Sequence, residues 1–401
     1  MKLFDDITRT EQRPKRENEA VFAYCNISAR RAVIAFRDLV EAWFQRYPQE
    51  VRKDLRARFR SPIDAQHRGA FFELYLHELL CSMGFECAIH PNMDRGTRTH
   101  PDFLISRNGQ PCFYLEATSA LPSQDETAKE RMIAQLYDSL NKTESPNFFV
   151  AVELNGTPTT SPPGKRLRQE LERWLSTLDP DDLRHRLETG GFDNLPSFEW
   201  SYQDWSISFL PIAKSSALRG KPGVRPIGTT LPTKAKAVDS HSSIHRAVIA
   251  KATKYGELAL PFIVAVNVFD IFADSIDVMN ALFGQEAVQV GRGPDGVLHN
   301  RLVRQPNGAW FGPRGPQNTR VSAALIALNL SPWAMASITP ILIHHPWASK
   351  PIPLEIWPLA QQALNRETHY MEERPGKSVR DFIALPDPWP LPDDDTADSQ
   401  I

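Results

Sequence analysis

Cysteine is scarce in this chain, with only four among 401 residues. Cys25, Cys81, Cys87 and Cys112 form no C-x-x-C pair, and the step from Cys81 to Cys87 fits no common zinc-binding spacing. The sequence therefore excludes a small disulfide-stapled scaffold and offers no zinc-finger pattern. We expect the four cysteines to be small core residues in a reducing compartment.

Long hydrophobic runs are also lacking. No stretch reaches about 18 uncharged apolar residues, the length that a membrane-spanning helix needs. The first twenty residues lack the apolar centre of a signal peptide and are acidic too early for a transit peptide. We therefore expect a cytoplasmic protein with no membrane partner.

An excess of charge of one sign is absent too. The 46 Lys and Arg residues balance 48 Asp and Glu residues, which gives a net charge of −2. Overall charge thus neither indicates nor excludes a nucleic-acid partner. The sequence contains no G-x-x-x-x-G-K-[ST] motif, which excludes an ATP-driven motor within this chain, and no G-x-S-x-G motif of serine hydrolases.

The residues that are present suit a globular protein with several compact parts. Hydrophobic residues make up 41% of the chain, and the 33 prolines predict long connections. We expect five parts along the chain. They are a helical N-terminal extension (1–65), an α/β core (66–155), a linker plus helix/strand insertion with a basic stretch (156–240), a further α/β region (241–385) and a disordered acidic tail (386–401).

Periodicity and turn residues predict the elements of the core. Helices are expected over 29–47 and 71–84, followed by three strands at 85–90, 102–106 and 112–117. Asn108-Gly109 is a strong hairpin signal, so these strands are expected to form an antiparallel meander. A helix over 125–141 then leads to a buried strand at 148–152, expected to lie parallel to a neighbour. The predicted fold class is a mixed α/β sheet.

A second helix–strand unit follows further along the chain. A helix over 244–255 leads into the run 261–266, which echoes the run 146–152. This similarity indicates a second layer added to the same sheet, a worn internal duplication, or coincidence between buried strands. Apolar runs at 322–330 and 338–344 are expected to complete a C-terminal sheet region.

Three carboxylates mark the core as the candidate site. Glu73 lies on the second predicted helix, Asp102 follows Pro101 at the start of the second strand, and Glu116 lies within the third strand. The hairpin brings Asp102 and Glu116 close together. Carboxylates in such positions need a partner, and two of them plus a substrate phosphate suit a hard cation such as Mg²⁺.

The order of these features resembles the PD-(D/E)xK nuclease superfamily, which has the restriction-endonuclease-like fold of helix, three strands, helix and strand. The resemblance covers residues 66–153. It implies that Asp102 and Glu116 coordinate Mg²⁺ or Mn²⁺ and that Glu73 is a third acidic ligand or orients a metal-bound water. It further implies a metal-dependent endonuclease, a hydrolase that cleaves phosphodiester bonds, and we expect DNA as its substrate.

One position departs from this pattern. Thr118 stands where the family has a lysine, two residues after the second acid. Three outcomes follow from the residues alone. The cation has moved, with Lys129 on the next predicted helix as the nearest candidate and Arg131 behind it; the enzyme works without it; or the site is inactive and the fold serves binding.

Each acid also has a purely structural interpretation. Glu73 could pair with Arg68 or His77, Asp102 could cap its own turn, and Glu116 could face solvent from an edge strand. The competing functions are therefore an inactive nuclease-fold protein that binds nucleic acid or a protein partner, and a structural protein whose carboxylates satisfy the core.

A basic stretch is the expected phosphate-binding region. Its residues are Lys214, Arg219, Lys221, Arg225, Lys234, Lys236, Lys251 and Lys254. The alternative is a solvated loop and helix face. The sequence leaves open whether the protein is a homodimer or has a partner protein that supplies a motor or sequence specificity.

Overall fold

The computed structural model describes residues 1–92, 100–121, 124–156, 160, 163–203, 205–221, 226–230, 240–292, 298–368 and 370–392. The chain divides into two compact units. The first unit comprises residues 1–13, 20–122 and 238–401, and the second comprises 14–19 and 123–237. The second unit is thus an insertion within the first, and the predicted core at 66–155 combines elements of both.

The described residues contain nine α-helices and sixteen strands, a mixed α/β fold as the sequence predicts. The helices are α1 (Val21–Ile27), α2 (Arg31–Arg46), α3 (Arg52–Phe59), α4 (Asp64–Ser82), α5 (Gln124–Leu140), α6 (Gly164–Leu175), α7 (Pro180–Gly190), α8 (Ser240–Ala252) and α9 (Ser275–Phe283). The strands of the first unit are β1 (Glu86–Ile89), β2 (Phe103–Arg107), β3 (Gln110–Ala120), β8 (Phe262–Val268), β9 (Glu286–Arg292), β10 (Leu298–Arg304), β11 (Phe311–Gly312), β12 (Gly315–Pro316), β13 (Ala323–Leu328), β14 (Ile341–His344), β15 (Gln361–Leu364) and β16 (Met371–Arg374). The strands of the second unit are β4 (Phe148–Asn155), β5 (Phe198–Tyr202), β6 (Trp205–Ala213) and β7 (Ile227–Thr230).

An eight-stranded sheet forms the centre of the first unit, in the order β1-β2-β3-β8-β13-β14-β15-β16. Strands β1, β2 and β3 form an antiparallel meander, which confirms the prediction for this segment. Asn108 and Gly109, both with positive φ, form the turn between β2 and β3. Strands β3, β8 and β13 are parallel to one another.

The predicted strand at 148–152 exists and has a parallel neighbour, but its expected place in the same sheet as the meander was wrong. The run 148–152 lies in β4, which pairs with β6 and β7 in the second unit. The parallel neighbour of β3 is instead β8, which follows α8. All seven residues of β8 are buried, as expected for a central parallel strand covered on both faces, whereas the end of β4 is only half-buried.

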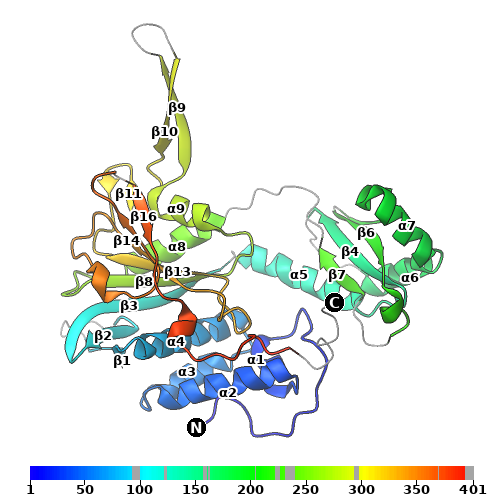
Figure 1. Ribbon diagram of the computed structural model, residues 1–401, viewed down its shortest axis with the longest axis horizontal. Helices are drawn as coiled ribbons and strands as arrows, with labels where there is room; N and C mark the ends of the chain where they lie inside the picture. The colour runs from blue at the N-terminus through cyan, green and yellow to red at the C-terminus, as the bar shows by residue number, and fades with distance from the viewer. Residues whose placement is uncertain are drawn as a thin grey trace. The chain divides into compact units, whose positions relative to one another are not determined.

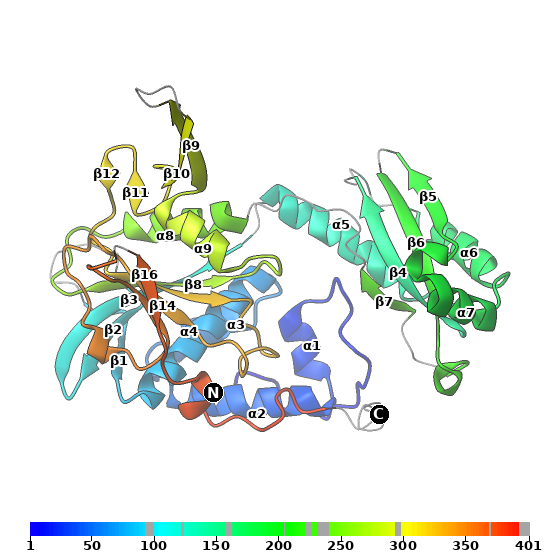
Figure 2. The ribbon, with the colours of Figure 1, turned by 45° about the horizontal axis from the view of Figure 1, so that its top comes forward.

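Helices cover both faces of the eight-stranded sheet, with α1–α4 on one side and α8 and α9 on the other (Figures 1 and 2). Alternating residues of β8 serve the two faces, because successive strand residues point in opposite directions. Ile263 and Ala265 belong to the core under α1–α4, while Val264 and Val266 belong to the core under α8 and α9.

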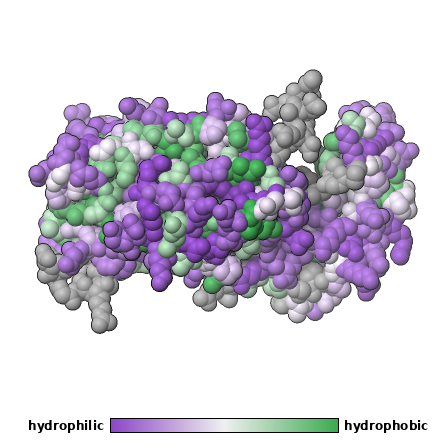
Figure 3. Space-filling model, turned by 90° about the horizontal axis from the view of Figure 1, so that it is seen from below, coloured by the Kyte–Doolittle hydropathy of each residue, from purple (hydrophilic) through white to green (hydrophobic). Residues whose placement is uncertain are grey.

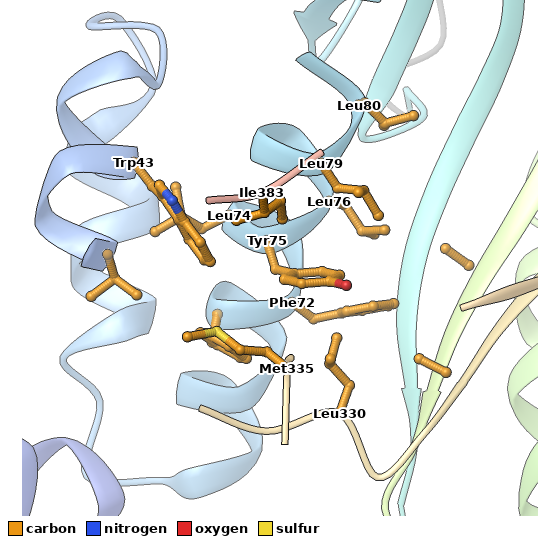
Figure 4. Packing of buried hydrophobic residues seen from close by; sticks show 14 of the residues in the cluster. Trp43, Phe72, Leu74, Tyr75, Leu76, Leu79, Leu80, Leu330, Met335 and Ile383 are labelled. Carbon is orange, nitrogen blue, oxygen red and sulfur yellow. The ribbon is translucent and has the colours of Figure 1, made fainter. Parts of the chain in front are cut away.

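The core under α1–α4 is aromatic-rich and almost free of solvent. Trp43 of α2 contacts Tyr75 of α4 with ring centroids 6.3 Å apart. Figure 4 shows Leu330, Met335 and Ile383 from late in the chain beside these helices. Residues far apart in the sequence therefore share one core, which joins the N-terminal helices and the C-terminal strands in a single unit.

The second unit has its own sheet and core. Its strands lie in the order β5-β6-β4-β7, and helices α5, α6 and α7 contribute buried leucines to a separate hydrophobic cluster. Leu167 and Leu171 of α6 are fully buried, as the helical spacing of apolar residues predicts. This sheet therefore forms around its own core.

The disordered tail was predicted to begin at residue 386, which is too early. Trp389 is buried, and its indole N–H donates to the carbonyl oxygen of Pro332 at 2.9 Å. Trp389 thus anchors this segment to the first unit, and residues 393–401 lie outside the described residues. Hydrophilic residues cover much of the face seen in Figure 3, and no helix in the described part of the chain is long and apolar enough to cross a membrane.

The burial of Phe113 predicts a large loss of stability on truncation. Phe113 is fully buried in β3 and meets Phe85 edge-to-face at 5.7 Å. We expect Phe113→Ala to lower the free energy of unfolding by about 3–5 kcal/mol, because it leaves a cavity. Phe272→Ala, at a residue 60% exposed in the same unit, is the control and is expected to cost less than about 0.5 kcal/mol. Urea denaturation followed by circular dichroism measures both, and equal losses would contradict the assignment of Phe113 to the core.

Candidate active site

The β2–β3 hairpin brings Asp102 and Glu116 together. Asp102 directly precedes β2, where Phe103 pairs with Leu115. The backbone N–H of Asp102 donates to Glu116 Oε2 at 3.2 Å, and the N–H of Ala117 donates to Asp102 Oδ2 at 2.8 Å. The carboxyl of Asp102 thus binds the neighbouring strand and does not cap its own turn.

Glu116 is completely buried, so its interpretation as an exposed edge-strand residue is wrong. It pairs with Val264 of β8 in the interior of the sheet. Because Val264 faces α8 and α9, the carboxylate of Glu116 points to the same side. A carboxylate in this position must find donors on α8, since isolated burial of a charge is costly.

The end of α8 supplies those donors. Lys251 Nζ lies 2.7 Å and Lys254 Nζ 2.9 Å from Glu116 Oε1, and the Tyr255 hydroxyl lies 2.6 Å from Oε2. Burial alone would raise the pKa of Glu116, but the charge of Lys251 and these hydrogen bonds outweigh it and lower that pKa. Glu116 is therefore held as a carboxylate.

From the sequence we expected the nearest cation at Lys129, on the next predicted helix. In the structure the ammonium groups beside Glu116 belong to Lys251 and Lys254. Lys251 and Lys254 were predicted as phosphate contacts, and Tyr255 was not predicted at all. The pattern K-x-x-K-Y puts all three residues at the end of α8 and just after it, a short segment before the buried strand β8. This pattern was the available signal for the three donors. Their proximity to Glu116 could not be read from the sequence, because the second unit separates them from β3 along the chain.

Asp102 titrates differently from Glu116. Burial is the largest cause that raises the pKa of Asp102, and the negative charges of Glu116 and Glu73 raise it further, to about 7. Asp102 as a whole residue is half-buried. The site therefore combines one firmly ionised carboxylate with one that gains or loses a proton near neutral pH.

Glu73 is already engaged by other side chains. Its Oε1 accepts from the Tyr47 hydroxyl at 2.6 Å, and its Oε2 forms an ion pair with Arg58 at 2.7 Å. The structural interpretation was right that Glu73 is paired, although its partners are not Arg68 or His77. Helix α4 lies on the opposite face of the sheet from α8. The negative charge of Glu73 nevertheless contributes to the raised pKa of Asp102.

Thr118 and Lys129, two residues predicted at the site, lie in different units of the chain. Thr118 follows Glu116 by two residues on β3 and pairs with Val266, so the two side chains share one face of the strand. Lys129 is exposed on α5, which belongs to the second unit. The ammonium groups that do lie beside Glu116 are those of Lys251 at the end of α8 and of Lys254 just after it.

Among the described residues of the rest of the basic stretch, Lys214 and Arg219 are already engaged by groups of the protein. Lys214 is buried and its Nζ donates to the Ser145 carbonyl oxygen at 2.8 Å, which leaves its ammonium no open surface for a phosphate. Arg219 forms a two-pronged ion pair with Asp181. Lys221 is exposed in the second unit. The remaining members lie outside the described residues; they are Arg225, Lys234 and Lys236.

The donor set for a metal is smaller than the three acids predicted. Among the residues that the structure describes, no group of three or more His, Cys, Asp or Glu side chains is arranged to hold a metal ion. The two oxygens of Glu73 accept from Tyr47 and Arg58, and those of Glu116 likewise accept from Lys251, Lys254 and Tyr255, so either carboxylate would have to exchange these partners to hold a metal. Asp102 and Glu116 remain as adjacent oxygen donors.

The raised pKa of Asp102 predicts that stability falls as pH rises. Its folded-state pKa of about 7 lies above the ordinary value of 3.8, so the folded chain holds a proton that the unfolded chain releases between these values. The free energy of unfolding therefore decreases from pH 4 to pH 7, by up to about 4 kcal/mol from this group. Asp102→Asn is expected to gain stability relative to wild type as the pH rises, measured by urea denaturation at pH 5 and pH 8. The control is Asp38→Asn at an exposed position, and an equal pH-dependent gain in both variants would contradict the assignment.

The pairing of Glu116 predicts strong coupling with the two lysines. Lys251→Met with Lys254→Met leaves a buried carboxylate without its cations, so we expect a loss of about 3 kcal/mol or more in the free energy of unfolding. Adding Glu116→Gln removes the uncompensated charge and is expected to restore much of that loss. A double-mutant cycle by urea denaturation measures the coupling, with exposed Lys53→Met as control. Purely additive losses would show that the ion pairs contribute nothing to stability.

Comparisons with known proteins leave the site to be interpreted from its own geometry. No protein-family model matches the chain, and searches of the curated proteins and of the solved structures found no match.

Proposed function

We propose that this protein is a divalent-metal-dependent nuclease that hydrolyses phosphodiester bonds in DNA. The observation that carries the proposal is the convergence of two carboxylates and two ammonium groups at one point of the sheet. Asp102 and Glu116 are joined across the hairpin, and Lys251 and Lys254 lie within 2.9 Å of Glu116. This combination provides ligands for a cation and positive charge for a phosphate in the same place.

The order of elements supports the proposal. Helix α4, the meander β1-β2-β3, helix α8 and the parallel strand β8 follow one another once the second unit is set aside. This order resembles the core of the PD-(D/E)xK nucleases, with α8 and β8 in the roles first assigned to α5 and β4. In this interpretation the lysine missing at Thr118 is replaced by Lys251 or Lys254.

The two carboxylates fit a divalent cation. Mg²⁺ takes oxygen ligands and commonly uses only one or two protein carboxylates, with water and substrate phosphate as its other ligands. Asp102 and Glu116 meet this requirement, and their mutual repulsion, which helps to raise the pKa of Asp102, would be relieved by a positive charge. A bound Mg²⁺ or Mn²⁺ would polarise the scissile phosphate and lower the pKa of the attacking water.

The chain's own side chains account for the remaining requirements. Lys251 and Lys254 are partly exposed, with side-chain exposures of 23% and 36%, so their ammonium groups can reach a phosphate as well as Glu116. Their positive charge would stabilise the negative charge that develops on the phosphate oxygens. Thr118 adds a hydroxyl on the same face of β3, as a neutral hydrogen-bond donor. Tyr255 fixes the orientation of Glu116 through Oε2.

One observation favours a second candidate function. Both oxygens of Glu116 and both oxygens of Glu73 already have hydrogen-bond donors in this structure. Carboxylates satisfied in this way are also what an inactive nuclease-fold protein would keep for stability while it binds nucleic acid or a protein partner. The two functions differ in whether phosphodiester bonds are broken.

Cleavage of a substrate panel tests the proposal. Single-stranded, duplex and branched DNA and RNA are incubated with wild type in Mg²⁺, Mn²⁺ or EDTA. We expect metal-dependent cleavage of DNA that is lost in Glu116→Gln, because glutamine keeps the size of the side chain but removes the charge that holds the cation. Lys251→Met and Lys254→Met are expected to reduce the rate by about 10²–10³-fold if the replaced lysine stabilises the transition state.

Two controls make the result interpretable. Lys53→Met removes an exposed lysine of the same unit and is expected to leave the rate unchanged. Circular dichroism establishes that each variant is folded, so that lost cleavage is not lost structure. If folded wild type cuts none of the substrates with any metal, but binds DNA with an affinity that falls with salt, the second candidate replaces the nuclease.

A further inference from the structure

Two of the four cysteines lie side by side at the surface of the first unit. Cys81 is in the last turn of α4, Cys87 is in β1, and their Sγ atoms are 3.7 Å apart. Between them Gly84 adopts a positive φ of 83°, which turns the chain so that β1 returns alongside the end of the helix. Cys81 is exposed and Cys87 is half-buried, so solutes reach the pair.

The two thiols differ in reactivity. The hydrogen bond from Cys87 is the largest cause that lowers the pKa of Cys81, and a contact with His77 Nε2 at 3.8 Å lowers it further, to about 5. The same hydrogen bond and burial raise the pKa of Cys87. Cys81 is therefore the nucleophilic thiolate and Cys87 the neighbouring thiol, an arrangement typical of oxidation-sensitive pairs.

We propose that Cys81 and Cys87 form a reversible disulfide with hydroperoxides as the oxidant. The Cys81 thiolate attacks one oxygen of hydrogen peroxide, the O–O bond breaks, and Cys81 becomes a sulfenic acid while hydroxide leaves and is protonated to water. The Cys87 sulfur then attacks the Cys81 sulfur, the S–O bond breaks, and a second water leaves with the proton of the Cys87 thiol. Two thiols and one hydrogen peroxide thus give one disulfide and two waters, and a dithiol reductant reverses the change.

The geometry makes this closure easy. A disulfide needs an S–S separation of about 2.0 Å, so the two sulfurs have to approach by less than 2 Å from their present positions. Cys81 is exposed near the end of α4, so its side chain can rotate toward Cys87, which lies on β1 at the edge of the sheet and packs against the core. The bond would fasten the end of α4 to β1.

The pair is also connected to the carboxylate site by contacts. His77, which touches Cys81, packs its ring against Tyr47 with centroids 4.9 Å apart, and the Tyr47 hydroxyl donates to Glu73. Disulfide formation removes the Cys81 thiolate from His77, and so changes the first contact in the chain of contacts from Cys81 through His77 and Tyr47 to Glu73. The proposal itself does not depend on nuclease activity.

Peptide mapping of the full-length protein tests the inference. Reduced protein is treated with about one equivalent of hydrogen peroxide, blocked with N-ethylmaleimide and cleaved after glutamate. Cleavage after Glu78 and Glu86 puts Cys81 in peptide 79–86 and Cys87 in peptide 87–116. We expect these peptides to be joined, to separate with dithiothreitol, and to remain unjoined in Cys81→Ser.

Cys112→Ser is the matched control, because Cys112 is half-buried like Cys87 and lies in the same peptide. The joined peptides are expected to persist in Cys112→Ser, and Cys81 is expected to lose its reactivity toward N-ethylmaleimide about tenfold faster than Cys112 during peroxide treatment. Loss of the joined peptides in Cys112→Ser would overturn the assignment of the partner. Oxidation of Cys81 to sulfinic or sulfonic acid without joining would overturn the proposal.

Discussion

The burial of the Glu116 carboxylate is the constraint on which the site depends. A fully buried charge in the interior of a sheet destabilises the fold unless donors surround it. Lys251, Lys254 and Tyr255 provide these donors only if the end of α8 lies over β3, and α8 reaches that position only when β8 is the parallel neighbour of β3. The hydrogen bonds and ion pairs that stabilise Glu116 therefore require this strand order, with β8 beside β3.

The inserted second unit separates in sequence what the first unit joins in space. Lys251 and Lys254 are 135 and 138 residues from Glu116. The chain leaves the sheet after β3 and returns just before α8, so the insertion enters at a crossover connection and interrupts no strand. Because the entropy cost of closing a loop grows only with the logarithm of its length, a compact insertion at this point adds little to the cost of bringing β3 and α8 together.

Local pattern predicted most elements, whereas pairing over long distances was predicted only in part. The meander β1-β2-β3 was predictable because Asn108-Gly109 fixes a tight turn between short strands. The choice of β4 over β8 failed because both are apolar runs after a helix. The distinguishing signal was composition, since β4 ends in Glu153 and Asn155, while β8 has a single polar residue, Asn267. The pairing of Glu73 with Arg58 and Tyr47 had no such signal, because it is made between separate helices.

Their surroundings shift the pKa values of the two carboxylates in opposite directions, upward for Asp102 and downward for Glu116. Donors on α8 keep Glu116 ionised, and that fixed negative charge, together with burial, holds a proton on Asp102 up to about pH 7. A proton and a divalent cation would relieve the same repulsion, so they would compete for Asp102. In the proposed nuclease, protonation of Asp102 would therefore oppose binding of the cation, because Lys251 and Lys254 pair with Glu116 and leave Asp102 without a cationic partner of its own.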